Sequence, residues 1–335
     1  MKKLKIAQIG IGHDHAPMAL AAIRHRSDLF DVVGYALPDI EKEKFADLLY
    51  HFDGLPELTA EQIMADPTIE AVVIETEEVN LTRYALMAAK AGKHIHMDKP
   101  GGLELADFEE MIEIMRSKNL IFHPGYMYRY NPEVIRLLER VRNGELGEIF
   151  AVEAHMDCFH TTEKQQWLGT FPGGMMFFLG CHLIDLLLQL RGMPDRIIPF
   201  NRCTGVDGVT SEDYGMVIFD YKNGVSFAKT CAEEVGGFAR RQLVVTGSKE
   251  TVELRPLEMG IPDSGGMQYT GLRFATDDVK NWHDLGKCTK SEPFDRYEPM
   301  MVSFCKMALG EKENPISYDY ELTLYKTLLK CCGVE

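Results

Sequence analysis

Histidine is concentrated at the points where short apolar segments of this chain end. The histidines in question are His13, His15, His96, His123 and His182. Imidazole groups transfer protons near neutral pH and also bind metal ions. His94, His96 and Asp98 alternate along one segment, so in a strand their side chains point to one face, as zinc ligands would. Polar lining of a pocket, or buried hydrogen-bonded histidines, is the simpler interpretation, and we predict no metal ion.

Lys99 follows that segment directly and precedes Pro100. Ligands bind at the carboxyl ends of parallel strands, where an ammonium group can stabilise charge that develops on a reacting oxygen. His182 and Asp185 are three residues apart and would share one face of a helix. There His182 could take up or return a hydroxyl proton. A solvated lysine and a core histidine are the purely structural alternatives.

A glycine-containing loop follows the first apolar segment, with the sequence Gly10-Ile11-Gly12-His13. The first glycine permits a tight turn, and the second lets the backbone approach a pyrophosphate at a helix N-terminus. The third glycine of G-x-G-x-x-G is replaced by His15, so the motif is incomplete. Its position between a strand and a helix still favours a dinucleotide site over a plain turn.

The acid expected to bind the adenosine ribose is displaced in this sequence. The second strand should end near Leu37, and Asp39 lies two residues beyond it. No arginine stands nearby to bind a 2′-phosphate, so the sequence favours NAD over NADP.

Strand and helix patterns alternate over the first 122 residues. The predicted strands are Leu4–Ile9, Val32–Leu37, Ala71–Thr76, His94–Met97 and Leu120–His123, and the predicted helices are Pro17–Arg26, capped by Asp14, Leu81–Ala91 and Leu105–Ser117. This alternation predicts a doubly wound α/β sheet with right-handed crossovers.

The pattern changes after Pro124, so we predict a Rossmann-type domain over residues 1–124 and a second domain over 125–335. Asn131-Pro132 should open a helix, since Asn caps and Pro suits the first helical position. The other predicted elements are the hairpin Asp213–Tyr221 with Val225–Cys231, the pair Gln242–Thr246 and Thr251–Leu254, and helices at Phe178–Leu190, 296–309 and 320–330. Residues 257–292 have weak periodicity and are expected to form a long excursion. The second domain is therefore predicted to be α+β with a largely antiparallel open sheet.

Several segments together resemble the Gfo/Idh/MocA oxidoreductases, the family of glucose–fructose oxidoreductase and inositol dehydrogenase. They are Ala91-Gly-Lys-His-Ile-His-Met-Asp-Lys-Pro100, Ile74-Glu-Thr76, Tyr128-Arg-Tyr-Asn-Pro132, Asn143-Gly-Glu-Leu-Gly147 and Gly173-Gly174 through Gly180-Cys-His-Leu-Ile-Asp185. Each segment alone is modest, but five in the family's order cover nearly the whole chain.

The resemblance implies hydride transfer between a nicotinamide cofactor, NAD or NADP, and a hydroxyl or keto carbon of a sugar, polyol or similar compound. Lys99 and His182 would be catalytic and would handle the proton. The implied cofactor-binding residues are Gly10, Ile11, Gly12, His13, Asp39, Thr76, Asp98 and Lys99. The implied substrate residues are Arg129, Trp167, His182 and Asp185. Arg129 could equally form a salt bridge at the domain interface. Relatives associate through the outer face of the second sheet, so a homo-oligomer is expected.

The sequence departs from the family pattern at a chemically important position. Phe178 stands four residues before the motif histidine, where many members have an acid. Asp157 or Asp213 could substitute for that acid. Two alternatives to a simple dehydrogenase follow: an epimerase or lyase that oxidises transiently and returns the hydride, and a cofactor-binding sensor or regulator that has lost turnover. Thr76-Glu77 and Leu81 also replace a Thr-Pro and a histidine of the family pattern.

The composition and charge of the chain limit which kinds of binding partner we expect. The 335 residues carry 36 basic and 51 acidic side chains, a net charge of −15, and 45% are hydrophobic. Residues 1–122 hold 13 basic and 21 acidic side chains, so neither half is basic. An acidic surface repels phosphate backbones and anionic bilayers, so we expect no nucleic-acid or membrane partner. Eight cysteines without a Cys-x-x-Cys pair, and no apolar run near ~20 residues, lead us to expect reduced thiols in a cytoplasmic protein.

Overall fold

The computed structural model describes residues 2–279 and 281–334, which form two compact units. The first comprises residues up to 127 together with 297–325, and the second comprises 128–296 together with the end of the chain from 326. Each unit has its own sheet and its own apolar core. In the described part of the chain, no helix is both long enough and apolar enough to cross a membrane. All eight cysteines are free thiols.

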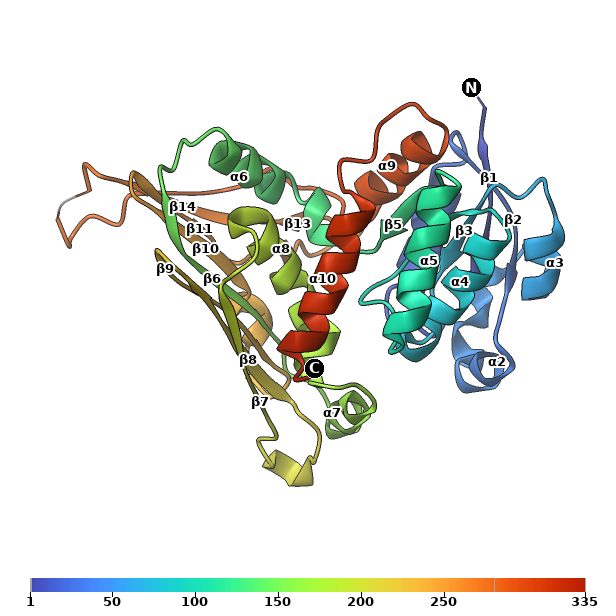
Figure 1. Ribbon diagram of the computed structural model, residues 1–335, viewed down its shortest axis with the longest axis horizontal. Coiled ribbons are helices and arrows are strands. Elements are labelled where there is room, and N and C mark those ends of the chain that lie inside the picture. Colours follow the sequence, from blue (N-terminus) through green and yellow to red (C-terminus); the bar gives the residue numbers. More distant parts are fainter. Residues whose placement is uncertain (1, 280, 335) are drawn as a thin grey trace. The chain divides into compact units, whose positions relative to one another are not determined.

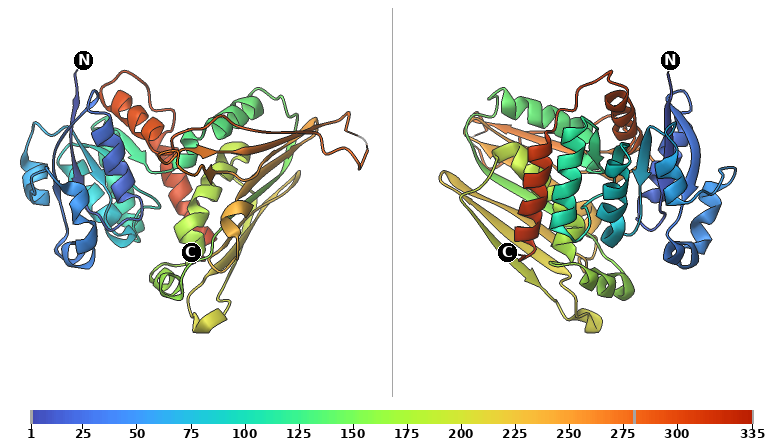
Figure 2. Two further views of the ribbon diagram at one scale, coloured as in Figure 1. Left: turned by 180° about the vertical axis from the view of Figure 1, so that it is seen from behind. Right: turned by 45° about the vertical axis from the view of Figure 1, so that its right-hand side comes forward.

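The first unit is built on a five-stranded parallel sheet of order β2-β1-β3-β4-β5. Its elements are β1 (Leu4–Ile9), α1 (Ala16–His25), β2 (Phe30–Ala36), α2 (Asp39–Lys44), a 3₁₀ segment (Ala46–Phe52), α3 (Ala60–Ala65), β3 (Ala71–Ile74), a 3₁₀ turn (Glu78–Asn80), α4 (Leu81–Lys90), β4 (His94–Met97), α5 (Leu105–Ser117), β5 (Phe122–Pro124) and α9 (Glu298–Ala308). Helices α4 and α5 lie together in front of the sheet in Figure 1, and α1 covers it in the rear view of Figure 2. The predicted doubly wound α/β fold is confirmed.

The second unit is built on an eight-stranded sheet of order β15-β14-β11-β10-β6-β9-β8-β7. Its elements are a 3₁₀ segment (Met127–Tyr130) at its start, α6 (Pro132–Arg142), β6 (Ile149–Asp157), α7 (Thr162–Trp167), a 3₁₀ turn (Leu168–Thr170), a π-helical turn (Met176–Gly180), α8 (Cys181–Arg191), β7 (Arg196–Arg202), a 3₁₀ turn (Val206–Gly208), β8 (Tyr214–Tyr221), β9 (Gly224–Cys231), a 3₁₀ turn (Gly237–Arg240), β10 (Gln242–Gly247), β11 (Glu250–Leu254), β12 (Met259–Gly260), β13 (Gln268–Tyr269), β14 (Gly271–Thr276) and β15 (Lys287–Lys290). Only β6 and β9 pair in parallel among the neighbours of this sheet. Helices α6 and α8 lie on one side of it (Figure 1). The predicted, largely antiparallel α+β unit is therefore present.

Local capping explains why α6 begins where it does. The Asn131 side-chain oxygen accepts the backbone N–H groups of Glu133 (2.9 Å) and Val134 (3.3 Å), and Pro132 occupies the first helical position. This start was predicted. The predicted cap of α1 is wrong: His15, not Asp14, is the N-cap residue of α1, and its side chain makes no capping hydrogen bond.

The C-terminal helices differ most from the expected organisation. Residues 297–325, expected in the second domain, group with the first unit. Helix α9 packs against α1, where Glu298 pairs with His25 (2.9 Å) and Arg26 (3.2 Å). Helix α10 (Tyr318–Cys331) begins in the first unit and ends in the second. Apolar periodicity predicts that such helices exist but does not say which sheet they cover.

The stretch 257–292 was expected to form a long excursion, but part of it belongs to the large sheet. It contains β14 and β15, which extend the large sheet at one edge. β15 is exposed along its whole length, so it lacks the alternation of buried and exposed residues by which strands are recognised. The prediction also missed β6, although that strand lies in the middle of the same sheet.

Candidate functional site

The glycine loop after β1 has the geometry that a phosphate-binding turn needs. Gly10 adopts φ +93°, and a Cβ there would lie 2.5 Å from the backbone nitrogen of Thr76. A Cβ on Gly12 would lie 2.6 Å from Cγ of Glu77. Since neither position can carry a side chain, the loop is confined against the segment that follows β3. Ile11 and Gly12 are thereby held immediately before α1, as a dinucleotide-binding turn requires.

Glu41 is the acid that meets this loop. Its Oε2 accepts the backbone N–H groups of Ile11 (2.9 Å) and Gly12 (3.0 Å), and its Oε1 accepts that of Glu77 (2.7 Å). Burial raises the pKa of Glu41, although these three hydrogen bonds oppose the shift. Asp39, expected at this site, is exposed in the first turn of α2. Glu41 was not predicted from the sequence, because its position depends on the short helix α2, which places it against the glycine loop.

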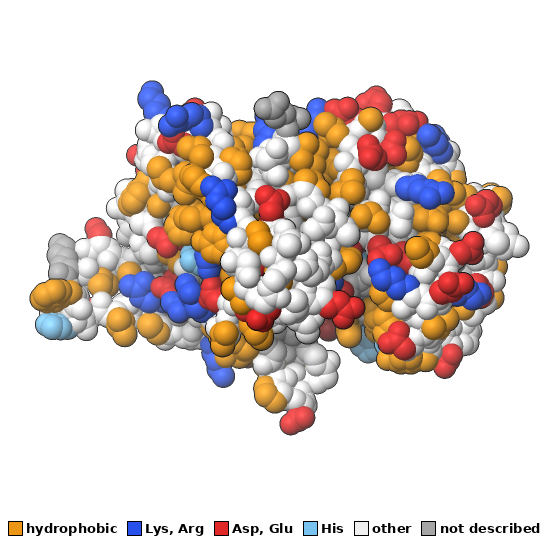
Figure 3. Space-filling view, turned by 90° about the horizontal axis from the view of Figure 1, so that it is seen from below, with side chains coloured by type: hydrophobic (Ala, Val, Ile, Leu, Met, Phe, Trp, Pro, Cys, Tyr) orange, Lys and Arg blue, Asp and Glu red, His pale blue; other side chains and the backbone are white. Residues whose placement is uncertain are grey.

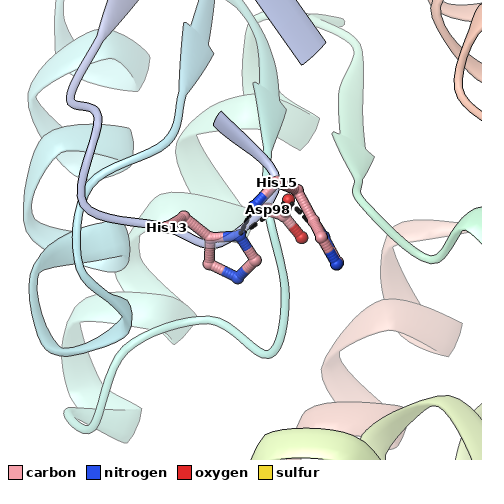
Figure 4. A group of neighbouring side chains, drawn as sticks. All are labelled: His13, His15 and Asp98. Carbon is pink, nitrogen blue, oxygen red and sulfur yellow. Dashed lines mark hydrogen bonds and ion pairs between the residues drawn. The ribbon is translucent and has the colours of Figure 1, made fainter. Parts of the chain in front are cut away.

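A buried polar cluster lies where β4 ends (Figure 4). The Oδ2 atom of Asp98 is 3.1 Å from Nδ1 of His13 and 3.0 Å from Nδ1 of His15. Burial opposes ionisation of Asp98, but the two histidines outweigh it and hold the pKa of this carboxyl well below its usual range. Burial lowers the pKa of His15 to about 4, whereas Asp98 outweighs burial at His13 and raises its pKa.

Two further side chains extend this cluster, Glu75 directly after β3 and His96 on β4. Glu75 is fully buried, and burial together with the nearby Asp98 raises its pKa well above the usual range. His96 lies 3.8 Å from Glu75, and its Nδ1 is 2.8 Å from Nδ1 of His123. Burial lowers the pKa of His96 to about 4, so this ring is neutral at pH 7. The trio His94, His96 and Asp98 is not brought together, because His94 instead accepts the backbone N–H of Ile121.

Lys99 is buried next to this cluster, directly after β4. Its backbone N–H donates to Oδ1 of Asp98 (2.6 Å), and its carbonyl oxygen lies 3.1 Å from Nε2 of His13. The peptide bond between Lys99 and Pro100 is cis. A buried ammonium at the carboxyl end of a central parallel strand can donate a hydrogen bond to a ligand oxygen.

In the second unit, His182 lies one residue inside α8 and is buried. Its ring meets that of Tyr128 edge to face, with the centroids 5.0 Å apart. Asp185, expected beside it as a substrate residue, is held by Arg129 through two hydrogen bonds of 2.8 and 2.9 Å. Arg129 and Asp185 thus form a bidentate ion pair inside this unit.

Phe178, in the π-helical turn before α8, lies among aromatic rings. Trp167 meets it edge to face at 5.3 Å, and the ammonium of Lys164 lies 3.7 Å from the Trp167 ring and 4.8 Å from that of Phe178. The two acids that could replace a carboxylate here are engaged elsewhere. Asp157 pairs with Lys229 (3.2 Å), and burial raises its pKa to about 6. Asp213 accepts hydrogen bonds from the backbone and hydroxyl of Thr204.

Comparison with known proteins agrees with both units. Residues 4–126 match the family described as "Oxidoreductase family, NAD-binding Rossmann fold", and residues 134–253 match the "GFO/IDH/MocA C-terminal domain". The chain is 27% identical over 198 residues to the uncharacterized oxidoreductase YhhX of Escherichia coli strain K12, covering 58% of this chain and 55% of that protein. It is 27% identical over 200 residues to the trans-1,2-dihydrobenzene-1,2-diol dehydrogenase of Bos taurus, covering 58% and 57%. The matched region thus spans about half the length of these curated relatives.

Solved structures share the fold over nearly the whole chain. An aldose-aldose oxidoreductase from Caulobacter crescentus superposes with a TM-score of 0.78 at 19% identity, covering 99% of this chain and 98% of that one. A putative NADPH-dependent oxidoreductase from Desulfitobacterium hafniense gives 0.75 at 18% identity, covering 99% and 95%. The family resemblance seen in the sequence is confirmed. The chain belongs to the Gfo/Idh/MocA family of oxidoreductases, whose N-terminal Rossmann domain binds NAD(P).

Proposed function

We propose that this chain is an NAD(P)-dependent oxidoreductase that moves a hydride between nicotinamide and a hydroxyl or keto carbon of a sugar, polyol or similar compound. The observation that carries the proposal is Lys99, a buried lysine at the carboxyl end of β4, beside the glycine loop after β1. A lysine in a buried polar cluster at such a position is a candidate functional residue, because burial of its charge is costly unless the charge serves a function there.

The residues present fit a dinucleotide. Gly10 and Gly12 leave a backbone-lined turn without Cβ atoms, and the N–H groups of Ile11 and Gly12 already hold an anionic group, the Glu41 carboxylate. The same amides would bind the cofactor phosphates. NAD is proposed over NADP, because the carboxylates Asp39 and Glu41 follow β2 and would repel a 2′-phosphate.

In the proposed reaction, the nicotinamide ring supplies or accepts the hydride when the cofactor is bound. The Lys99 ammonium donates a hydrogen bond to the reacting oxygen and stabilises the alkoxide that develops there. His182 takes up or returns the hydroxyl proton. Thr76, Asp98, Arg129 and Trp167 are proposed to line the cofactor and substrate positions.

The second candidate is a sensor or regulator that binds cofactor without turnover. Phe178 favours it, since a phenyl ring among Trp167 and Lys164 can neither bind a substrate hydroxyl strongly nor tune an imidazole. The same residue is compatible with transient oxidation that returns the hydride, as in an epimerase or lyase.

Cofactor titration and a substrate screen separate these candidates. The purified protein is expected to bind NAD(H) or NADP(H), and a sugar or polyol is expected to change the nicotinamide absorbance. Lys99→Met and His182→Ala should abolish turnover while retaining cofactor binding, with the exposed Lys90→Met and His283→Ala as matched controls. Lack of cofactor binding would overturn the proposal. Tight binding with no turnover across the screen would favour the sensor.

A homo-oligomer in the cytoplasm is the proposed state. The open face of the large sheet exposes apolar side chains on β7 and β9, namely Ile198 (36% exposed), Phe200 (42%) and Val225 (49%). On the face drawn in Figure 3, acidic and basic side chains are intermixed, and the described residues form no broad basic area there. Apolar contact between copies is thus better supported than binding to nucleic acid or membrane.

A further inference from the structure

Two consecutive residues of the 3₁₀ segment Met127–Tyr130 contact the beginning of α8. The ring of Tyr128 meets the imidazole of His182 edge to face, with the centroids 5.0 Å apart and the ring planes at 88°. The next residue, Arg129, forms the bidentate pair with Asp185, which lies three residues after His182 and on the same face of the helix. The same short segment therefore contacts the His182 side chain and also fixes the helical turn that carries it.

The hydroxyl group of Tyr128 is anchored in a buried ionic network. It hydrogen-bonds to the Glu258 carboxylate, and Nη1 of Arg241 lies 3.4 Å from the hydroxyl oxygen. Oε1 of Glu258 also accepts hydrogen bonds from Arg241 (3.1 Å) and Arg296 (2.7 Å). Burial, reinforced by Glu258, raises the pKa of Tyr128 to about 12, so the hydroxyl keeps its proton and donates it to the carboxylate. Because the ring is held at its Cβ and at its hydroxyl, it presents a fixed surface to His182.

The two segments that build this network are also joined to each other. The side-chain amide of Asn131, which caps α6, donates to the carbonyl oxygen of Leu257 (3.2 Å). The backbone N–H of Leu257 in turn donates to the carbonyl oxygen of Arg241 (2.8 Å). Since Leu257 directly precedes Glu258, the carboxylate and the segment that carries Tyr128 are held in one framework.

A histidine that transfers a hydroxyl proton must keep one nitrogen directed at the reacting group. The two ring nitrogens are distinct, and the hydrogen bond that one of them makes decides which of them carries the proton. Displacement of a reacting group by about 1 Å can cost ~10²-fold in rate. An edge-to-face contact favours one mutual orientation of two rings, so it can supply the restraint that such a histidine needs.

We propose that Tyr128 is a positioning residue for His182, in which the Tyr128 ring restrains the imidazole and Glu258 fixes that ring through its hydroxyl. The proposal rests on the proposed function, in which His182 takes up or returns the hydroxyl proton. Tyr128 itself transfers no proton in this role, since its hydroxyl is committed to the Glu258 carboxylate. The alternative is that Tyr128 only fills the core, in which case its replacement lowers stability without disturbing the His182 ring.

Nitrogen NMR of the full-length protein, labelled with ¹⁵N-histidine, tests the proposal without a substrate, because it reports which nitrogen of a neutral imidazole carries the proton. His182→Gln assigns the signals. The parent protein should show one dominant tautomer of His182. Tyr128→Leu removes the ring and should raise the proportion of the minor tautomer about 2- to 10-fold, the range that corresponds to the loss of an edge-to-face contact. Tyr128→Phe keeps the ring and should stay close to the parent.

Phe227→Leu is the matched control, because Phe227 makes an edge-to-face contact of the same kind with His155 in the same unit, at 5.4 Å. It should leave the His182 signals unchanged. Circular dichroism accompanies each variant. If Tyr128→Leu does not fold, Tyr128→Met takes its place, since a flexible methionine side chain fills irregular space in a core.

Three results would each overturn the proposal: both tautomers of His182 equally populated in the parent, the parent tautomer ratio retained in Tyr128→Leu, or the same disturbance in Phe227→Leu as in Tyr128→Leu. With a sugar or polyol that the parent turns over, Tyr128→Leu should also lower kcat by at least about tenfold while the dissociation constant of the cofactor stays unchanged. Failure of the proposed function appears as absence of turnover in the parent. Failure of the positioning role appears in the NMR spectra, so the two failures are distinguishable.

Discussion

Replacing Glu41 by alanine is expected to tighten cofactor binding while weakening the fold. The carboxylate accepts three backbone N–H groups, those of Ile11, Gly12 and Glu77, and is fully buried. Hydrogen bonds to a charged group contribute about 1.5–3 kcal/mol each, but burying the charge costs several kcal/mol, and the raised pKa of Glu41 shows that burial outweighs the three bonds in deciding its ionisation. Alanine would nevertheless leave these three backbone N–H groups without their acceptor, and from that loss we expect a decrease of about 1–3 kcal/mol in the free energy of unfolding.

Glu41→Ala should also make the free energy of cofactor binding more favourable by about the same amount. In the proposed cofactor site the phosphates use the amides of Ile11 and Gly12, which Glu41 occupies, so we expect the parent protein to displace its own carboxylate when it binds the cofactor. Removing a competitor worth about 1–3 kcal/mol lowers the dissociation constant roughly 5- to 100-fold, at 1.4 kcal/mol per factor of ten.

Nicotinamide fluorescence titration measures the affinity, and urea denaturation followed by circular dichroism measures the stability. Glu43→Ala is the matched control, since Glu43 lies on the same helix α2 and is exposed. It should change neither quantity by more than about 0.5 kcal/mol. Weaker cofactor binding by a folded Glu41→Ala protein would refute the reasoning and would mean that Glu41 contacts the cofactor instead of competing with it.

Two further predictions concern the second unit, which contains both tryptophans, so tryptophan fluorescence follows its unfolding. Glu258→Gln leaves the buried Arg241 (3.1 Å away) without its carboxylate, and urea denaturation should show a loss of about 3–5 kcal/mol in the free energy of unfolding. Glu253→Gln, in a half-exposed pair, is the control and should lose under about 1 kcal/mol. Equal losses in the two variants would contradict this prediction. Burial, followed by Lys229, lowers the pKa of His155 to about 4. The folded state therefore disfavours the protonated ring, and this residue should lower the free energy of unfolding of the parent protein by about 2 kcal/mol between pH 7 and pH 5. His155→Gln should remove this pH-dependent loss. An unchanged pH dependence in the variant would contradict the prediction.

Residue patterns in the sequence predicted those features of the fold that depend on residues close to one another in the chain. Asn131 and Pro132 predict the start of α6, because a cap and a first-turn proline act within one helical turn. The strand His94–Met97 was predicted with its exact ends, and Lys99 was predicted to lie just beyond its carboxyl end. The alternation of strands and helices predicted the doubly wound parallel sheet, since right-handed crossovers leave few topologies.

Features that depend on contacts distant in sequence could not be predicted in this way. Glu41 meets the glycine loop some 30 residues away, and the sequence favoured Asp39 because it lies nearer the expected end of β2. Two histidines of the cluster at Asp98 come from the loop after β1, so alternation along β4 alone selected the wrong partners. Periodicity describes which face of an element is buried, but not which other segment supplies the opposing groups.

An acidic chain that binds a dinucleotide needs a local source of positive potential, and the structure identifies it. Three carboxyl groups, those of Glu41, Glu75 and Asp98, are buried at one edge of the first sheet, in the more acidic half of the chain. The Glu41 carboxylate accepts three backbone N–H groups, and that of Asp98 is held by one backbone N–H and two imidazoles. Donors that hold one anion in place are oriented to hold another, because their dipoles are fixed by the backbone and not by net charge. We therefore expect the donors at Glu41 and Asp98 to be able to hold an anionic ligand, and removal of either carboxylate should make its donors available.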